Sequence, residues 1–476
     1  MLTSKRMSDA RSVAANPLRV ALRVFALFTL IYLCTWAGHY TSGDGAYKVA
    51  WAKAMLGQTP EIGPDQNGVY SKYGIGHSLL SVPPLAIAHF IQTRTGIRCE
   101  AALYTLMFIL NGAIFLGLLA FYLAHFYPVR AVWWTVLIAG LATTWWPYTK
   151  LDFSEPLVLT IAFLGFVLMR FGYPVLGMLV AGFTLAIRSD SIVILGPLVL
   201  WYLLSHRSVQ AVLKVALSVA PSIGLVLFAN YIRYHSLLDR GYAGEEFSNP
   251  FLVGVYGILL SSGKSIFLFS PPLLLGAWGW KKFASRTPNS SDAWLFLGIC
   301  IAQVLLYAKW WDWSSDDAWG NRFLVPGVLL MCIPMVAVVH RRAFVIPVVA
   351  VGLAVQLLAV TVGGLNFLQL LRSLPAERDA LYVGGSNRID FEDLRFDPNY
   401  SQIEGNYILL RYLLHRPPKP GKPEEAAKVG TSLHDAIPPQ AWTSFARWDF
   451  VWNLARSARP GAASKPAPAP ASSPIQ

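Results

Sequence analysis

The sequence predicts an all-α polytopic membrane protein with about 11 transmembrane helices. Of its 476 residues, 55% are hydrophobic and 14% are charged, whereas ordinary globular chains carry roughly a quarter charged residues. Eleven apolar stretches come close to the roughly 20 residues that cross a bilayer as a helix. Basic residues mark every second connection between these stretches, which is typical of a protein oriented by its Lys and Arg residues.

The predicted spans follow a basic N-terminal segment, 1–19. No small-residue cleavage site follows the first apolar run, so we expect an uncleaved anchor with a cytoplasmic N-terminus. Two spans are short and flank a charged break. With approximate limits, the spans are 20–39, 101–126, 131–147, 155–171, 174–187, 191–205, 213–231, 264–280, 293–311, 323–339 and 343–365.

Charge distinguishes the two ends of these spans. With the N-terminus inside, every inner connection is basic, and the outer connections hold most of the acids. Because Lys and Arg collect in cytoplasmic loops, this predicts a multi-pass protein of the plasma (inner) membrane. The same rule accounts for the net charge of +13, so we expect no nucleic-acid partner. The inner connections are 127–130, 170–173, 206–214, 281–292 and 340–342.

Two outer connections are long. The first, 40–100, contains two helical stretches at 45–57 and 78–91, which we expect to lie in the plane of the membrane interface. The second, 232–263, is polar at first and then apolar.

By parity, the part of the chain after the last span lies outside. We expect a small extracytoplasmic segment at 366–458, followed by an Ala/Pro-rich tail at 459–476. The composition of that tail cannot build a core, so the tail is predicted to be disordered.

Asp44 is a lone carboxylate between Gly43 and Gly45, directly after the first predicted span. Aspartate is a good helix N-cap, and the predicted helix 45–57 begins right after it, so a structural role explains this residue. An ionisable residue at the membrane edge is also a functional candidate by default, and glycine neighbours let a ligand approach the backbone. Both interpretations stay open.

The stretch VYSKYGIGHSLLSVPP places Lys72 between Tyr70 and Tyr73, shortly before His77. A lysine ammonium near the interface can bind phosphate as a point charge. The structural alternative is a lysine that snorkels from an interfacial helix.

The stretch WWPYTKLDFSEPLV contains Asp152 and Glu155 between the third and fourth spans. Ser154 followed by Glu-Pro is a good helix start, and an acid in the first turn is favoured by the helix dipole. This explains Glu155. It does not explain why Asp152 lies on the same outer side as Asp44.

Later motifs add further charged candidates. Arg188 and Asp190 interrupt an apolar run and either pair with each other or contact substrate. Lys264 and Arg322 each open a span on the outer side, where either could meet a phosphate. Candidate ligands for a divalent cation, without a specific spacing, are Asp312, Asp316 and Asp317.

Together these motifs resemble the GT-C superfamily of integral-membrane glycosyltransferases, in particular its bacterial members akin to protein O-mannosyltransferases and the lipid A aminoarabinose transferase. Asp44 stands in the first outer loop, where such enzymes carry an acid, and SKYGIGHSLLSVPP and PYTKLDFSEP follow in order. GKSIFLFSPP, WGNRFLVPG and FDPNYSQIEGNYILL resemble later motifs. The likeness covers most of 20–410 and implies that 20–365 is a catalytic membrane domain.

The resemblance implies an enzyme that moves a hexosyl or pentosyl group, with inversion, from a polyprenyl-phosphate donor to an extracytoplasmic acceptor. That acceptor would be a glycan, a lipid or a protein. Asp44 would be the base, with Asp152 or Glu155 orienting sugar or acceptor. The implied donor-phosphate ligands are Lys72, Lys264 and Arg322, and the implied substrate-binding residues are Tyr70, Tyr73, His77 and Arg188.

Three questions stay open at this point. Many relatives carry two adjacent acids in the first loop, whereas Gly45 follows Asp44 here, so the need for a divalent cation is undecided and no other cofactor is expected. A polyisoprenoid-linked glycan transporter or flippase would need charges along the middle of several spans and often two repeated halves, and we see no such repeat. A non-catalytic scaffold would show outer charges that do not converge.

Overall fold

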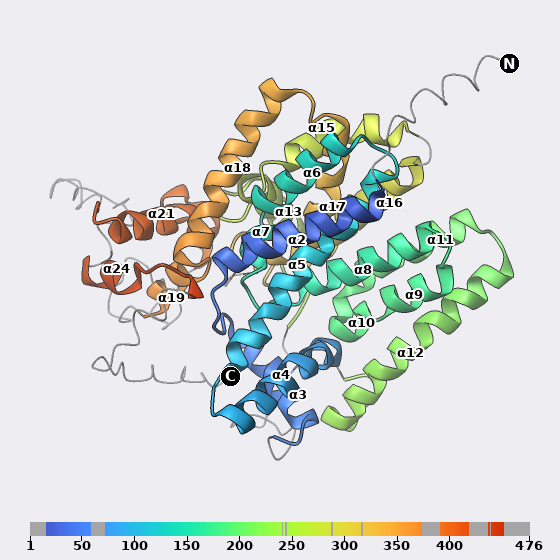
Figure 1. Ribbon diagram of the computed structural model, residues 1–476, viewed down its shortest axis with the longest axis horizontal. Coiled ribbons are helices and arrows are strands. Elements are labelled where there is room, and N and C mark those ends of the chain that lie inside the picture. The colour runs from blue at the N-terminus through green and yellow to red at the C-terminus, as the bar shows by residue number, and fades with distance from the viewer. Residues whose placement is uncertain are drawn as a thin grey trace.

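The computed structural model describes residues 16–58, 72–239, 241–242, 245–286, 289–315, 318–373, 391–417, 437 and 439–451. Every regular element within these residues is a helix (Figure 1). The chain is therefore an all-α polytopic membrane protein, as predicted. Five helices are long and apolar enough to cross a membrane: α2 (Pro17–Thr35), α5 (Glu100–Ala124), α12 (Val209–Tyr234), α16 (Asn289–Lys309) and α18 (Arg342–Val362).

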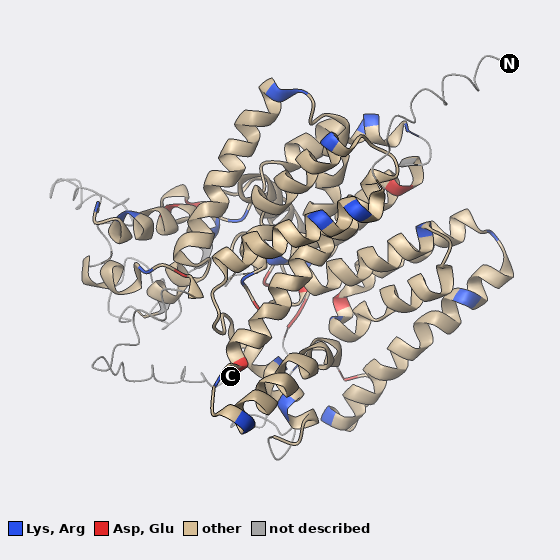
Figure 2. Cartoon of the chain, in the orientation of Figure 1, with Lys and Arg blue, Asp and Glu red and all other residues tan. Residues whose placement is uncertain are grey.

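The other predicted spans are also helical, but they are shorter or broken. In 264–280, for example, Pro271 and Pro272 separate two helices, because proline has no N–H to continue the ladder. Figure 2 shows long uncharged stretches of ribbon, with Lys and Arg mainly near helix ends. The helices of these shorter or broken spans are α6 (Val129–Leu141) with α7 (Trp145–Tyr148), α8 (Glu155–Arg170), α9 (Pro174–Gly182) with α10 (Thr184–Ile187), α11 (Ile192–Ser205), α14 (Ile266–Phe269) with α15 (Leu273–Ala284), and α17 (Val325–Cys332).

The first outer connection contains the two expected helices, α3 (Gly43–Met55) and α4 (Ile75–Thr95), which lie together at one end of α5 (Figure 1). Helix α3 begins earlier than predicted because Ser42 caps it, its hydroxyl accepting the Gly45 N–H at 3.1 Å. The interpretation of Asp44 as the N-cap is therefore wrong. The location of α3 and α4 in the plane of the membrane interface stays a prediction. The second long connection contains α13 (Phe251–Leu260).

The chain after α18 forms a small helical cluster of its own, beside α18 in Figure 1. Its apolar side chains make a separate core, in which the fully buried Trp442 ring stacks on Phe367. The predicted domain limits stay predictions, and the tail 459–476 lies outside the described residues. The helices of this cluster are α19 (Asn366–Arg372), α20 (Phe391–Phe396), α21 (Gln402–Leu413) and α24 (Pro439–Phe445).

Residues 446–451, here called the C-terminal strap, lead from this cluster back to the membrane helices. The Val451 N–H donates to the Trp36 carbonyl at 2.7 Å, just after α2 ends. The Asp449 N–H donates to the carbonyl of Thr361 at 2.9 Å, near the end of α18. The strap thus joins the ends of two long helices that are far apart in the sequence.

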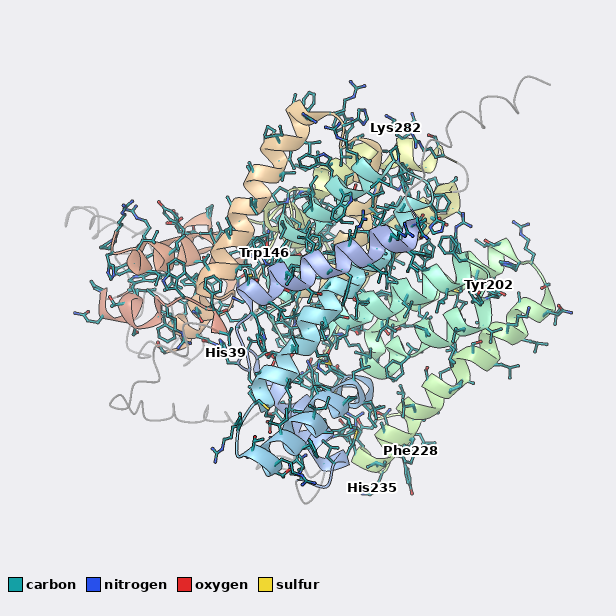
Figure 3. All side chains as sticks on the ribbon, viewed as in Figure 1. His39, Trp146, Tyr202, Phe228, His235 and Lys282 are labelled. Atoms are coloured by element: carbon teal, nitrogen blue, oxygen red, sulfur yellow. The ribbon has the colours of Figure 1, made fainter. Side chains whose placement is uncertain are left out.

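The Asp449 side chain adds an ionic contact to the strap. Its carboxylate accepts from Lys150 Nζ at 2.8 Å and from His39 Nε2 at 2.9 Å. Burial raises the pKa of Asp449, but the charges of Lys150 and His39 outweigh it and hold that pKa well below its usual value. Figure 3 shows His39 between the end of α2 and the C-terminal helices. The strap therefore holds the chain just before both Asp44 and Asp152.

Asp449→Asn should destabilise the protein, because it leaves the buried Lys150 ammonium without its carboxylate. Removing one partner of a buried ion pair costs about 3–5 kcal/mol, so the midpoint of thermal unfolding in detergent should fall. The matched control is Asp239→Asn, which makes the same change at an exposed residue and should unfold with the wild type. Equal midpoints for all three proteins would show that the Asp449 ion pairs contribute nothing to stability.

Candidate active site

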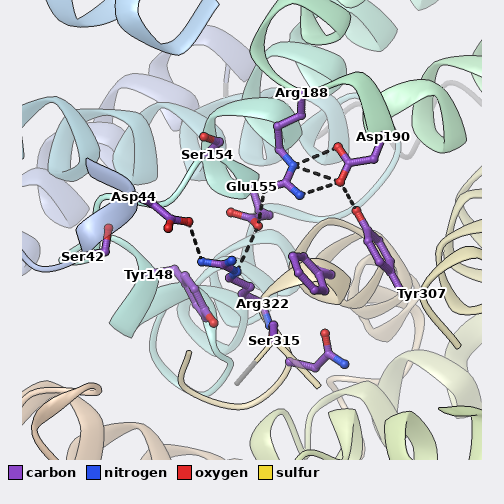
Figure 4. Close-up of polar contacts among 12 residues, drawn as sticks. Ser42, Asp44, Tyr148, Ser154, Glu155, Arg188, Asp190, Tyr307, Ser315 and Arg322 are labelled. Atoms are coloured by element: carbon purple, nitrogen blue, oxygen red, sulfur yellow. Dashed lines mark hydrogen bonds and ion pairs between the residues drawn. The ribbon is translucent and has the colours of Figure 1, made fainter. Parts of the chain in front are cut away.

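Asp44 lies in the first turn of α3 (Figure 4), and two partners hold its carboxylate. Its Oδ2 accepts from Arg322 Nη1 at 3.0 Å, and its Oδ1 accepts from the Tyr73 hydroxyl at 2.5 Å. Burial raises the pKa of Asp44, but the charges of Arg322 and Lys48 and the Tyr73 hydrogen bond outweigh it and hold that pKa well below its usual value. Asp44 is therefore ionised at neutral pH.

Asp152 reaches α3 from the connection between α7 and α8. It is fully buried, and its Oδ1 accepts from the hydroxyls of Thr41 at 2.7 Å and Ser42 at 2.5 Å. Its Oδ2 has no hydrogen bond among the described residues and faces Gly45, where an added Cβ would lie only 1.9 Å away. Gly45 is required here for space, because a side chain would overlap the Asp152 carboxylate.

Glu155, the first residue of α8, links two arginines. Its Oε1 accepts from Arg188 Nη1 at 2.7 Å and lies 3.6 Å from Arg322 Nε. Arg188 also forks onto Asp190, whose Oδ2 accepts from the Tyr307 hydroxyl at 2.5 Å. Figure 4 shows this network continuing from α3 through both arginines. Arg188 and Asp190 do pair, but Arg188 simultaneously holds Glu155.

Lys48 is a buried cation in this cluster that we did not expect from the sequence. It is only 2% exposed. Its Nζ donates to the backbone carbonyl of Asp152 at 3.4 Å and lies 5.0 Å from the centre of the Tyr73 ring. The sequence did contain a signal, since Lys48 follows Asp44 by four residues in a helix and such residues share a face.

A cavity of about 330 Å³ adjoins the cluster. Arg188, Asp190 and Arg322 line it on the cluster side. Lys72 lines it too, paired with Glu245 and lying 5.3 Å from the centre of the Tyr242 ring. Apolar walls with a few charged groups are typical of small-molecule sites. The aromatic lining residues are Tyr73, Tyr242, Phe247, Tyr307, Trp310, Trp311 and Phe323.

Two other residues singled out from the sequence, His77 and Lys264, are not among those that line this cavity. His77 is fully buried, with Nδ1 2.8 Å from the Ser154 hydroxyl. Lys264 is buried and donates to backbone carbonyls, among them that of Gly320 at 3.2 Å, so it supports the chain just before Arg322. Tyr70 lies outside the described residues.

The described residues contain no group of three or more His, Cys, Asp or Glu side chains that could hold a metal ion. Of the three aspartates considered as cation ligands, Asp312 lines the cavity, while Asp316 and Asp317 lie outside the described residues.

Comparison with known proteins gives one structural similarity. No family model and no curated protein sequence matches the chain. The chain is similar to a crystal structure of ArnT from Cupriavidus metallidurans in the apo state, with 13% identity and a TM-score of 0.45, over 90% of this chain and 74% of that one. At this identity and score the similarity says nothing about chemistry.

Gly45→Ala should disturb the cluster, because its Cβ would lie 1.9 Å from Asp152 Oδ2 and force the carboxylate or α3 to move. Gly43→Ala is the matched control in the same turn, since a Cβ there meets nothing within 4 Å. We expect a lower midpoint of thermal unfolding for Gly45→Ala and no loss for Gly43→Ala. If Gly45→Ala unfolds with the wild type, Asp152 does not occupy the position described.

Proposed function

We propose that this protein is a membrane glycosyltransferase that moves a sugar from a polyprenyl-phosphate donor to an extracytoplasmic glycan, lipid or protein. Convergence carries the proposal: Asp44 comes from one connection, Asp152 and Glu155 come from another, and these acids meet beside a cavity with cationic and aromatic walls. A scaffold gives no reason for such convergence. The motif resemblance to GT-C enzymes supports the same conclusion.

Asp44 is the proposed general base. The acceptor hydroxyl attacks the anomeric carbon while its proton passes to the Asp44 carboxylate. The bond from the anomeric carbon to the phosphate oxygen breaks, and the phosphate leaves with the bonding electrons. A single displacement of this kind inverts the configuration of the sugar.

The resting hydrogen bonds of Asp44 suggest how donor binding would activate this base. With Arg322 and Tyr73 on its oxygens and a low pKa, Asp44 binds a proton weakly. A phosphate that drew Arg322 toward itself would remove a cation from Asp44 and raise its pKa. The base would then become strong only when the donor is present.

Arg322 and Lys72 are the proposed phosphate ligands, because both line the cavity and carry positive charge. A guanidinium forks onto phosphate oxygens, and an ammonium neutralises the leaving group as its charge grows. Lys264 is left out of the phosphate site because its ammonium is occupied by backbone carbonyls. Asp152 and Glu155 would orient sugar or acceptor.

The cavity suits the rest of such a donor. Its aromatic rings offer faces for the sugar, and its acids offer acceptors for hydroxyl groups. A prenyl tail would remain among the membrane lipids, which explains a site carried by a membrane protein. The proposed location is the extracytoplasmic face of the plasma (inner) membrane, since the acids belong to the connections that the charge pattern puts outside.

Asp44→Asn should leave the protein folded and inserted but abolish sugar transfer, because an amide cannot take up the proton. The measurement is transfer from a polyprenyl-phosphate sugar in detergent, with folding checked by size-exclusion chromatography. Asp239→Asn is the control and should transfer at the wild-type rate. Wild-type transfer by Asp44→Asn would place the base elsewhere, at Asp152 or Glu155.

Lys72→Ala should weaken donor binding more than acceptor binding, because it removes a cation from the cavity wall. Native mass spectrometry of the purified protein should detect a co-purifying prenyl-phosphate sugar, and this adduct should be depleted in Lys72→Ala. Lys53→Ala is the control, since Lys53 pairs with Glu100 on the partly exposed side of α3. Equal adduct in all three proteins removes Lys72 from the phosphate site.

A further inference from the structure

The acid cluster of the candidate active site surrounds a lysine that has no obvious structural task. Asp44, Asp152 and Glu155 all act electrostatically on Lys48. Asp152 and Glu155 each keep one buried oxygen without a hydrogen bond among the described residues. Carboxylates brought this close repel one another unless positive charges lie among them. Arg322 and Arg188 contact Asp44 and Glu155, whereas Asp152 forms no ion pair with a described residue.

Lys48 has few contacts for a buried ammonium. Among the described residues its three N–H donors make one long hydrogen bond, 3.4 Å to the backbone carbonyl of Asp152, and it is 2% exposed. It forms no ion pair of hydrogen-bonding length with any described residue, whereas Lys53, five residues further along α3, pairs with Glu100 at 2.7 Å. An ammonium that served only to anchor α3 would be expected to have a close partner or a path to water.

We propose that the Lys48 ammonium is a resident cation of this cluster alongside Arg188 and Arg322, and that it holds Asp152 in place beside Asp44 in the role that a divalent cation plays in other acid-rich sites. Lys48 is thus a positioning residue, acting through the carboxylates and not on the substrate. The inference rests on the proposed function for its activity readouts and names the source of the positive charge that this function left undecided.

Gly45 and Lys48 make the arrangement together. The absent side chain at position 45 lets the Asp152 carboxylate reach α3. One turn later, Lys48 places a positive charge beside the acids. Because this charge belongs to the chain itself, no metal ion and no metal ligands are needed to supply it. Unlike a metal ion, a lysine can lose its charge by giving up a proton. Burial lowers the pKa of Lys48, although the carboxylates of Asp44, Asp152 and Glu155 oppose this.

This loss of charge gives a pH signature. As pH rises through the lowered pKa, Lys48 becomes neutral, the cluster loses one of its cations, and transfer should fall. An arginine stays charged throughout this range, so Lys48→Arg should move the alkaline fall of the transfer rate to higher pH. The charged and titratable groups that face Lys48 are Asp44 on α3, Tyr73 and His77 at α4, Asp152 and Glu155 at α8, and Arg322.

The experiment compares wild type, Lys48→Met, Lys48→Arg and the control Lys53→Met in the transfer assay, with and without a chelator. Lys48→Met, which keeps the length and removes the charge, should lose about 100-fold in rate, the usual loss for one preorganised electrostatic contact. Lys48→Arg should recover most of that loss, Lys53→Met should match the wild type, and the chelator should leave the wild-type rate unchanged.

A second readout needs no transfer activity. Binding of Mn²⁺ to the purified protein, followed by electron paramagnetic resonance, should show no Mn²⁺ whose binding depends on Asp152, judged by comparing wild type with Asp152→Asn. Asp152-dependent Mn²⁺ binding overturns the inference, and so does a chelator-sensitive rate restored by Mg²⁺.

The variants also separate this inference from the proposed function. A wild-type rate in Lys48→Met, with Asp44→Asn inactive, overturns the role of Lys48 and leaves the glycosyltransferase standing. If Lys48→Met fails to fold, Lys48→Arg decides: an alkaline fall at the wild-type pH overturns the inference, and a fall at higher pH supports it.

Discussion

The constraint on which this site depends is that charges away from water must find partners within the protein. Arg322 meets it by contacting Asp44 at 3.0 Å and lying 3.6 Å from Glu155. These acids are carried by different helices, and Arg322 follows a third connection. One guanidinium therefore fixes three connections relative to one another, and Arg188 extends the same arrangement to Asp190. The site is a consequence of charge balance among connections that the membrane helices bring to one place.

Backbone space matters as much as charge. Position 45 carries no side chain, and the Asp152 carboxylate occupies the place where one would begin. A chain with two adjacent acids in its first loop would present both from α3, whereas this chain brings its second carboxylate from the connection between α7 and α8. The lone Asp44 of the sequence is therefore not alone in space. The C-terminal strap holds the chain just before both acids, through His39 and Lys150.

Much of the fold could be predicted from the sequence, because long apolar runs indicate membrane-spanning helices and basic connections indicate how a membrane protein is oriented. All eleven predicted spans are helical, but their breaks depend on packing, as at Pro271 and Pro272. The convergence of Asp44 with Asp152 followed from their shared side. The hydrogen-bond partners of individual side chains could not be predicted in this way. Ser42 caps α3 in place of Asp44, and Lys264 donates to backbone carbonyls. Which partner a side chain binds depends on residues that are distant in the sequence, and a local sequence pattern does not contain that information.

An ionised acid with a low pKa is poorly suited to take up a proton. In the proposed mechanism the contact between Arg322 and Asp44 accounts both for the weak base of the empty site and for the stronger base of the donor-bound site. Arg322 contacts the Asp44 carboxylate and also lines the cavity, so in the proposed mechanism a donor phosphate would compete with Asp44 for one guanidinium. The more of that charge the phosphate took, the stronger a base Asp44 would become. The proposed mechanism therefore couples the basicity of Asp44 to the presence of a leaving group, and water that entered an empty site would meet only a weak base.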